Sequence, residues 1–209
     1  MALPIRRPDA VKITYAGLLT AIVIVLQSLG NFIRIGNLAI SLAQVPIVIG
    51  AALFGPLAGA WLGAVFSAMT FMDASVALFW AVSPVGTVVT IMLKGTLAGF
   101  CSGVVYKFLK KFNGYVATMV SSIVCPVVNT GIFALGCYLF FMDYIMQEAT
   151  KVGITAGALL LFGFIGINFV IELVTNIVFA PVVVRFTKLQ NHANNSNEKQ
   201  AIKNTNESE

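Results

Sequence analysis

An uncharged stretch of 38 residues, Ile35–Met72, constrains the fold of this chain more than any other feature. One membrane-spanning helix needs only about 20 apolar residues, so this stretch is too long for a single span. Gly55 and Pro56 interrupt it near its middle, where proline removes a hydrogen-bond donor and glycine permits a tight turn. The pattern predicts a helical hairpin with arms at Ile40–Phe54 and Leu57–Met72.

Both predicted arms are short for a membrane span. About 15 residues rise only about 23 Å, whereas the hydrocarbon core of a bilayer is about 30 Å thick. We therefore expect tilted arms, or arms that stop early where a loop folds in over a cavity. Small residues recur every four positions on the second arm, at Gly59, Gly63 and Ser67. This spacing predicts close contact with another helix of a packed bundle.

The composition indicates an integral membrane protein. The chain is 58% hydrophobic and 10% charged, whereas soluble domains are usually about 25% charged. Its lone histidine, His192, lies in a polar tail, which excludes most metal sites and histidine-based catalysis. We expect neither a metal nor a cofactor. The net charge of +5 is attributed to membrane topology and not to nucleic-acid binding.

The sequence predicts an all-α bundle of six transmembrane helices over residues 1–188. Beyond this domain, residues 189–209 form a polar tail that we expect to be disordered, because it has too few apolar residues for a core. The six predicted spans are Ile13–Ile33, the two hairpin arms, Thr87–Tyr106, Tyr115–Phe141 and Ala156–Val184.

The basic residues predict the orientation of this bundle. Six spans place both termini on one side, and cytoplasmic loops carry an excess of lysine and arginine. If the termini lie inside, the only lysines and arginines in the outer loops are Arg34 and Lys151. The cytoplasmic side then holds Arg6, Arg7, Lys12, Lys107, Lys110, Lys111, Arg185 and Lys188. Both termini are therefore predicted to be cytoplasmic.

Polar residues within three predicted spans fall in one layer. Lys94 lies 13 residues from Lys107, and Glu172 lies 13 residues from Arg185, so both are about 20 Å from the inner boundary. Asn129 and Asn168 fall near the same depth. Charges inside a membrane usually face a cavity or the bundle interior. The four residues predict a small-molecule pocket that opens outward beneath the Asp73–Gly86 and Met142–Thr155 connections.

Each of these residues also has a structural interpretation. Lys94 and Glu172 could neutralise each other between helices, and both interpretations hold if substrate lies beside the pair. Asn129 and Asn168 could be hydrogen-bond ties between helices. Trp80 could be an aromatic lid over the polar layer or an interfacial residue.

Three segments carry a resemblance to a known family. The first is Leu42–Ala64, which contains PIVIGAALFGPLAGAWLGA. The second runs from Lys94-Gly95 to Tyr106-Lys107 in the fourth span, and the third, in the sixth span, contains Asn168, Glu172 and Ala180-Pro181. Over residues 12–188 this pattern resembles the substrate-binding S component of energy-coupling factor (ECF) transporters. The chain departs from the family pattern at Lys94, where many members carry arginine, and at Gly17, where alanine is usual.

The resemblance implies a membrane-embedded subunit that captures a vitamin from outside a prokaryotic cell. Such subunits dock onto a transmembrane T component and two cytoplasmic ATPases, and small residues of the first span, here Gly17 and Ala21, form the docking face. Without the resemblance, such a pair most often means ordinary packing within the bundle. The chain has no phosphate-binding loop and is not expected to be an enzyme.

The sequence favours pantothenate as the substrate, because a lone buried cation with amides and few pocket aromatics suits a small hydroxylated carboxylate. Riboflavin is the alternative, with Phe79 and Trp80 as stacking groups. An ion-coupled secondary transporter is a rival class, although no internal repeat is evident. An intramembrane enzyme would need a nucleophile with a base, and Ser67 and Ser83 have no histidine partner.

Overall fold

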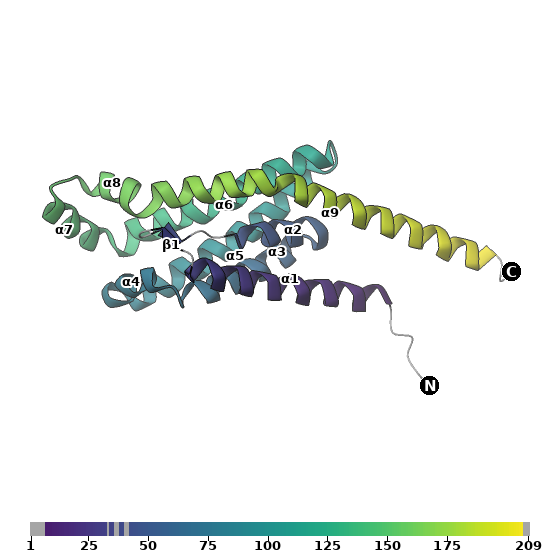
Figure 1. The fold of residues 1–209 in the computed structure, drawn as a ribbon, viewed down its shortest axis with the longest axis horizontal. Helices are drawn as coiled ribbons and strands as arrows, with labels where there is room; N and C mark the ends of the chain where they lie inside the picture. Colours follow the sequence, from purple (N-terminus) through teal and green to yellow (C-terminus); the bar gives the residue numbers. More distant parts are fainter. Residues whose placement is uncertain (1–6, 33, 36–37, 40–41, 207–209) are drawn as a thin grey trace, which may run out of the picture.

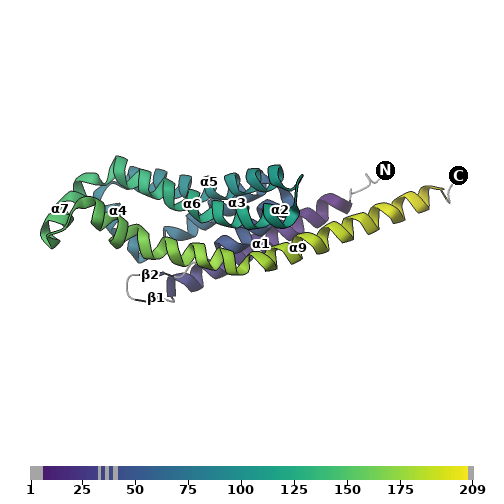
Figure 2. The same ribbon diagram turned by 90° about the horizontal axis from the view of Figure 1, so that it is seen from above.

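The computed structural model describes residues 7–32, 34–35, 38–39 and 42–206. The described part is almost wholly helical, and most of its helices run along one long axis (Figure 1). Helix α1 (Arg7–Phe32) starts and helix α9 (Gly166–Asn206) ends at the same end of the molecule, while α4 (Ala77–Val82) and α7 (Met142–Val152) lie at the opposite end (Figure 2). The predicted fold class, an all-α membrane protein, is confirmed.

Helices α2 (Gln44–Phe54) and α3 (Pro56–Thr70) form the predicted hairpin. Gly55 between them has a φ of 96°, a conformation that favours glycine, and Pro56 opens α3, where its missing N–H is not needed. The arms contact each other, because a Cβ atom on Gly59 would meet the Ala51 side chain. The hairpin is confirmed from residue 42 onward; residues 40–41 of the predicted first arm lie outside the described residues.

The small residues of α3 pack against α5 (Pro84–Leu109). A Cβ atom on Gly59 would clash with the backbone carbonyl of Gly99, and one on Gly63 would clash with that of Gly95. Ser67 continues the contact by donating a hydrogen bond to the Ile91 carbonyl at 2.7 Å. The predicted close helix contact is therefore confirmed.

On its other side, α5 contacts α6 (Gly114–Phe140) through a pair of buried serines. The Oγ atoms of Ser102 and Ser121 lie 2.7 Å apart, and Ser121 Oγ also donates to the Ser102 carbonyl at 2.8 Å. Interhelical hydrogen bonds of this kind satisfy hydroxyls in an apolar bundle. Helix α5 thus lies between α3 and α6.

Four helical segments of the described chain are long and apolar enough to cross a membrane: Ile13–Gly30, Pro84–Leu109, Gly114–Phe140 and Ala156–Thr187. A fifth candidate joins α3 to Ala74–Val82 across a bend of 75°. Helix α2 has 11 residues and rises only about 16 Å, too little for a span by length alone. Length and composition therefore support four or five crossings. The predicted six are reached only if α2 and α3 count as separate short crossings.

The predicted connections contain regular structure. Between α1 and α2 lie two paired strands, β1 (Arg34–Ile35) and β2 (Leu38–Ala39). The 73–86 connection forms a short 3₁₀ helix (Ala74–Val76) followed by α4, and the Asp73 side chain caps it by accepting from the Ser75 N–H at 2.8 Å. The 142–155 connection forms α7, which packs on the bundle through buried Ile145 and Ala149.

The last span and the tail form one long helical segment. After α8 (Ala156–Ala158), a π-helical stretch (Leu159–Ile165) leads into α9. We expected residues 189–209 to be disordered, but α9 continues as a helix to Asn206. Residues 182–206 contain neither glycine nor proline, and extending an existing helix needs no new nucleation. A polar helix can therefore continue here without a core of its own.

Candidate functional site

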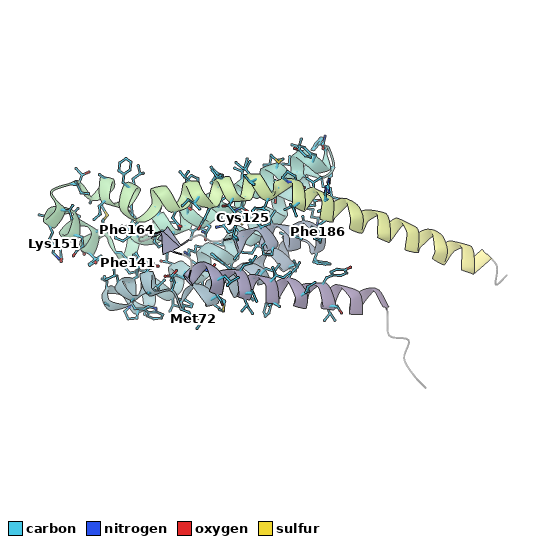
Figure 3. All side chains as sticks on the ribbon, viewed as in Figure 1. Met72, Cys125, Phe141, Lys151, Phe164 and Phe186 are labelled. Carbon is cyan, nitrogen blue, oxygen red and sulfur yellow. The ribbon has the colours of Figure 1, made fainter. Side chains whose placement is uncertain are left out.

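A cavity of about 390 Å³ lies among the described helices. Its volume falls in the range typical of small-molecule sites. Figure 3 labels two of its lining residues, Phe141 and Phe164, in the half of the molecule that carries α4 and α7. The polar lining residues are Gln27, Thr70, Asp73, Ser75, Thr87, Thr90, Lys94, Asn129, Thr130, Asn168 and Glu172. Four of the five residues predicted for the site, Lys94, Asn129, Asn168 and Glu172, therefore meet at one cavity.

The Glu172 carboxylate is the centre of a buried network of amides. Its Oε2 atom accepts hydrogen bonds from Gln44 Nε2 at 2.6 Å and from Asn129 Nδ2 at 3.2 Å, and its Oε1 atom accepts from Asn168 Nδ2 at 3.4 Å. Glu172 is only 4% exposed. A buried carboxylate needs such donors, because an unpaired charge in an apolar interior is costly.

Gln44 is the network residue that sequence reasoning missed. It begins α2, is 1% exposed and joins α2 to α9. A polar residue inside the uncharged 35–72 stretch was the available signal. Asn176 also belongs to the network: it donates to Gln44 Oε1 and to the Glu172 carbonyl, each at 2.9 Å, and it does not line the cavity.

Lys94 lines the same cavity but makes no ion pair with Glu172 among the described residues. Its Nζ atom lies 5.1 Å from the centre of the Phe133 ring, a cation–π distance. The proposed neutralising tie between Lys94 and Glu172 is therefore not made by direct contact. Amides satisfy the carboxylate instead, which leaves the ammonium facing an aromatic ring.

Phenylalanines form the apolar part of the cavity lining. Phe79 packs edge-on against Phe133, Phe141 and Phe164, with ring centres 5.7, 4.9 and 5.8 Å away. Together with Phe66 these residues make five phenylalanines around the cavity. The expectation of few pocket aromatics is therefore wrong, because phenylalanines from separate segments of the chain converge here.

Trp80, predicted as a lid, does not line the cavity. It is 37% exposed and packs against Phe71 with ring centres 5.6 Å apart. Consecutive residues of a helix point about 100° apart, so α4 presents only one of its two neighbouring aromatic side chains to the cavity. That residue is Phe79, which is 8% exposed.

Among the described residues, five buried side-chain polar atoms have no hydrogen-bond partner, and three of them belong to cavity-lining side chains: Thr90 Oγ1, Asn129 Oδ1 and Asn168 Oδ1. Buried polar atoms are nearly always paired in folded proteins. Unpaired atoms gathered around one cavity are expected where a ligand supplies the missing partners.

The two first-span residues predicted for docking lie apart from this cavity lining. Gly17 and Ala21 are both exposed on α1, and a Cβ atom on Gly17 would have no neighbour within 4 Å among the described residues. Packing within this described part of the chain therefore does not account for the small residue at Gly17.

Comparison with known families identifies the family of this chain. The sequence model of a family described as "ECF transporter, substrate-specific component" matches residues 11–184. The match includes every residue that lines the cavity. No curated protein and no solved structure matches the chain.

Proposed function

The chain belongs to the family of ECF transporter substrate-specific components, and from this membership we propose that it captures a vitamin-type small molecule for ATP-driven import. Members of this family are substrate-binding subunits of membrane transporters and not enzymes. One observation carries the proposal. Lys94, Asn129, Asn168 and Glu172, which lie on three helices, line one cavity of small-molecule size.

The proposed orientation places this cavity toward the outside of a prokaryotic cell membrane. The α5–α6 turn, which carries Lys110 and Lys111 and follows Lys107 in the last turn of α5, lies toward the end where α1 starts and α9 ends (Figure 1). Basic residues favour the cytoplasmic side. The end that carries α4, α7 and the cavity then faces outward, and both termini are cytoplasmic, as in the six-crossing arrangement.

The proposed partners are a transmembrane T component and two cytoplasmic ATPase subunits. The exposed small residues Gly17 and Ala21 support a docking face on α1, because small side chains let a partner helix approach closely. The cavity supplies binding, and the partners supply ATP hydrolysis.

Two ligand chemistries compete for the cavity. Lys94, which is free of a direct ion pair with Glu172, supports a carboxylate such as that of pantothenate. The five phenylalanines around the cavity favour a flat ring such as that of riboflavin, because aromatic side chains offer flat apolar surfaces for stacking. The riboflavin-type alternative therefore gains support from the cavity lining.

Titration of the purified full chain tests binding. The panel consists of pantothenate, riboflavin, thiamine, biotin and folate, each measured by calorimetry in lipid nanodiscs without any partner. We expect one compound to bind at least about tenfold more tightly than the rest, a difference of about 1.4 kcal/mol. Equal, weak binding of the whole panel would contradict the proposed ligand class.

Uptake into liposomes separates this proposal from secondary transport. The chain alone should not concentrate its ligand, whereas the chain with the T component, both ATPases and ATP should. Concentrative uptake by the chain alone, driven by a sodium or proton gradient, would instead assign it to the ion-coupled class.

A further inference from the structure

The two asparagines of the cavity are held through their nitrogen atoms. Asn129 Nδ2 donates to one oxygen of Glu172 and Asn168 Nδ2 donates to the other, at 3.2 and 3.4 Å. A side-chain amide carries its donor and its acceptor on two different atoms of one planar group. Binding both nitrogens therefore leaves both Oδ1 atoms as acceptors, and neither has a partner in the described part of the chain.

The rest of the network keeps the amides in this orientation. An ionised carboxylate only accepts hydrogen bonds, so turning either asparagine over would place its oxygen against an oxygen of Glu172. Gln44 cannot turn over easily either, because its Oε1 accepts from Asn176 while its Nε2 donates to Glu172. The direction of these hydrogen bonds is thus determined: Asn176 donates to Gln44, and Gln44 donates to Glu172.

We propose that Glu172 is a positioning residue for ligand specificity. By fixing the nitrogens of Asn129 and Asn168, it makes their oxygens the acceptors of this side of the cavity. The site therefore takes a ligand that donates hydrogen bonds here through N–H or O–H groups. The inference rests on the proposed function, since it requires that the ligand occupies this cavity.

A matched pair of ligands tests the donor requirement. Riboflavin carries an imide N–H at the edge of its ring, and 3-methylriboflavin carries a methyl group at that nitrogen. Pantothenate and its N-methylated amide analogue form a second pair. The methyl group replaces the donor hydrogen, so an asparagine Oδ1 atom stays unpaired in the complex. The methylated ligand of each pair should therefore bind about 5- to 140-fold more weakly than the unmethylated one.

Glu172→Gln tests whether Glu172 sets this preference. The new amide is a donor on one side, so at least one asparagine must turn its oxygen toward it. In this variant the ratio of the two dissociation constants should fall, so that the dissociation constant of the methylated ligand exceeds that of the unmethylated ligand by no more than about threefold. The unmethylated ligand should still bind. If Glu172→Gln does not fold, Asn168→Ala removes one acceptor and only the longest of the three hydrogen bonds to Glu172, and it should also lower the ratio.

Asn176→Ala is the matched control. Asn176 belongs to the same buried network but does not line the cavity, so its loss should lower thermal stability and leave the ratio unchanged. A purely structural Glu172 would behave in the same way. An unchanged ratio in Glu172→Gln, or no effect of methylation on the wild type, would overturn the inference while the proposed function stands. If neither riboflavin nor pantothenate binds, the inference fails together with the proposed ligands, and the uptake assay then decides the proposed function separately.

Discussion

Gln44 and Glu172 are 128 positions apart in the sequence, and their side chains are joined by a buried hydrogen bond of 2.6 Å. This contact joins α2, the first arm of the hairpin, to the last helix of the bundle. It brings a residue of the uncharged stretch into contact with the carboxylate at the cavity.

Gln44→Leu should therefore destabilise the protein by about 1–3 kcal/mol, because Glu172 loses a donor and Asn176 loses an acceptor. Thermal unfolding in detergent measures the change. The control is Gln147→Leu on α7, where the glutamine is exposed and the change should stay within about 0.5 kcal/mol. Equal effects at the two positions would contradict a stabilising role for the network.

Lys94→Met should weaken ligand binding without lowering stability. A ligand that accepts a hydrogen bond from the ammonium should lose about 1.5–3 kcal/mol, or roughly 10- to 150-fold in affinity. Removing a half-buried charge that has no direct ion pair with Glu172 should be neutral or stabilising for the fold. Lys107→Met, exposed on the same helix, is the control and should change neither property. A loss of stability of about 3–5 kcal/mol in Lys94→Met would instead indicate a structural ion pair.

Phe79→Leu should lower ligand affinity more than Trp80→Leu does. Phe79 lines the cavity and is in contact with three other rings, whereas Trp80 lies outside the lining. An aromatic contact is worth about 0.5–1.5 kcal/mol, so we expect about a 2- to 13-fold loss for Phe79→Leu, measured by calorimetry. The reverse order would restore Trp80 as the aromatic residue that covers the ligand.

Gly63→Ala should destabilise the protein by about 1–3 kcal/mol, because the added methyl group meets the Gly95 carbonyl at the α3–α5 contact. Gly131→Ala on α6 is the matched control. Its Cβ atom would have no neighbour within 4 Å, and alanine favours the helix, so it should be neutral or slightly stabilising. Unfolding midpoints of the two variants measure the difference, and similar values would mean that the α3–α5 contact is looser than described.

Gly17→Trp and Ala21→Trp should abolish transport by the assembled importer while ligand affinity stays near that of the wild type. Both positions are exposed on α1 and lie outside the cavity lining, so a bulky side chain should block only a partner helix. Leu18→Trp provides the control, because Leu18 is 56% exposed and points about 100° around the same helix. Loss of ligand binding in the Gly17 or Ala21 variants would contradict a docking role.

The sequence alone was sufficient for the membrane class, the hairpin at Gly55-Pro56 and a close helix contact through the small residues of α3, since each depends on local composition or on a short repeat. It also selected Lys94, Asn129, Asn168 and Glu172 by depth, because a helix of known rise places polar residues at calculable heights. Height along a helix does not determine which way a side chain faces around the bundle.

Tertiary structure decided the partners of those residues. Opposite charges suggested that Lys94 pairs with Glu172, yet amides from α2, α6 and α9 satisfy the carboxylate. Sequence proximity could not reveal Gln44, which reaches Glu172 only because α2 packs beside α9 in the folded bundle. The choice of Phe79 over Trp80 likewise follows from the rotation of α4 about its axis, and that rotation is set by packing between helices and not by the local sequence.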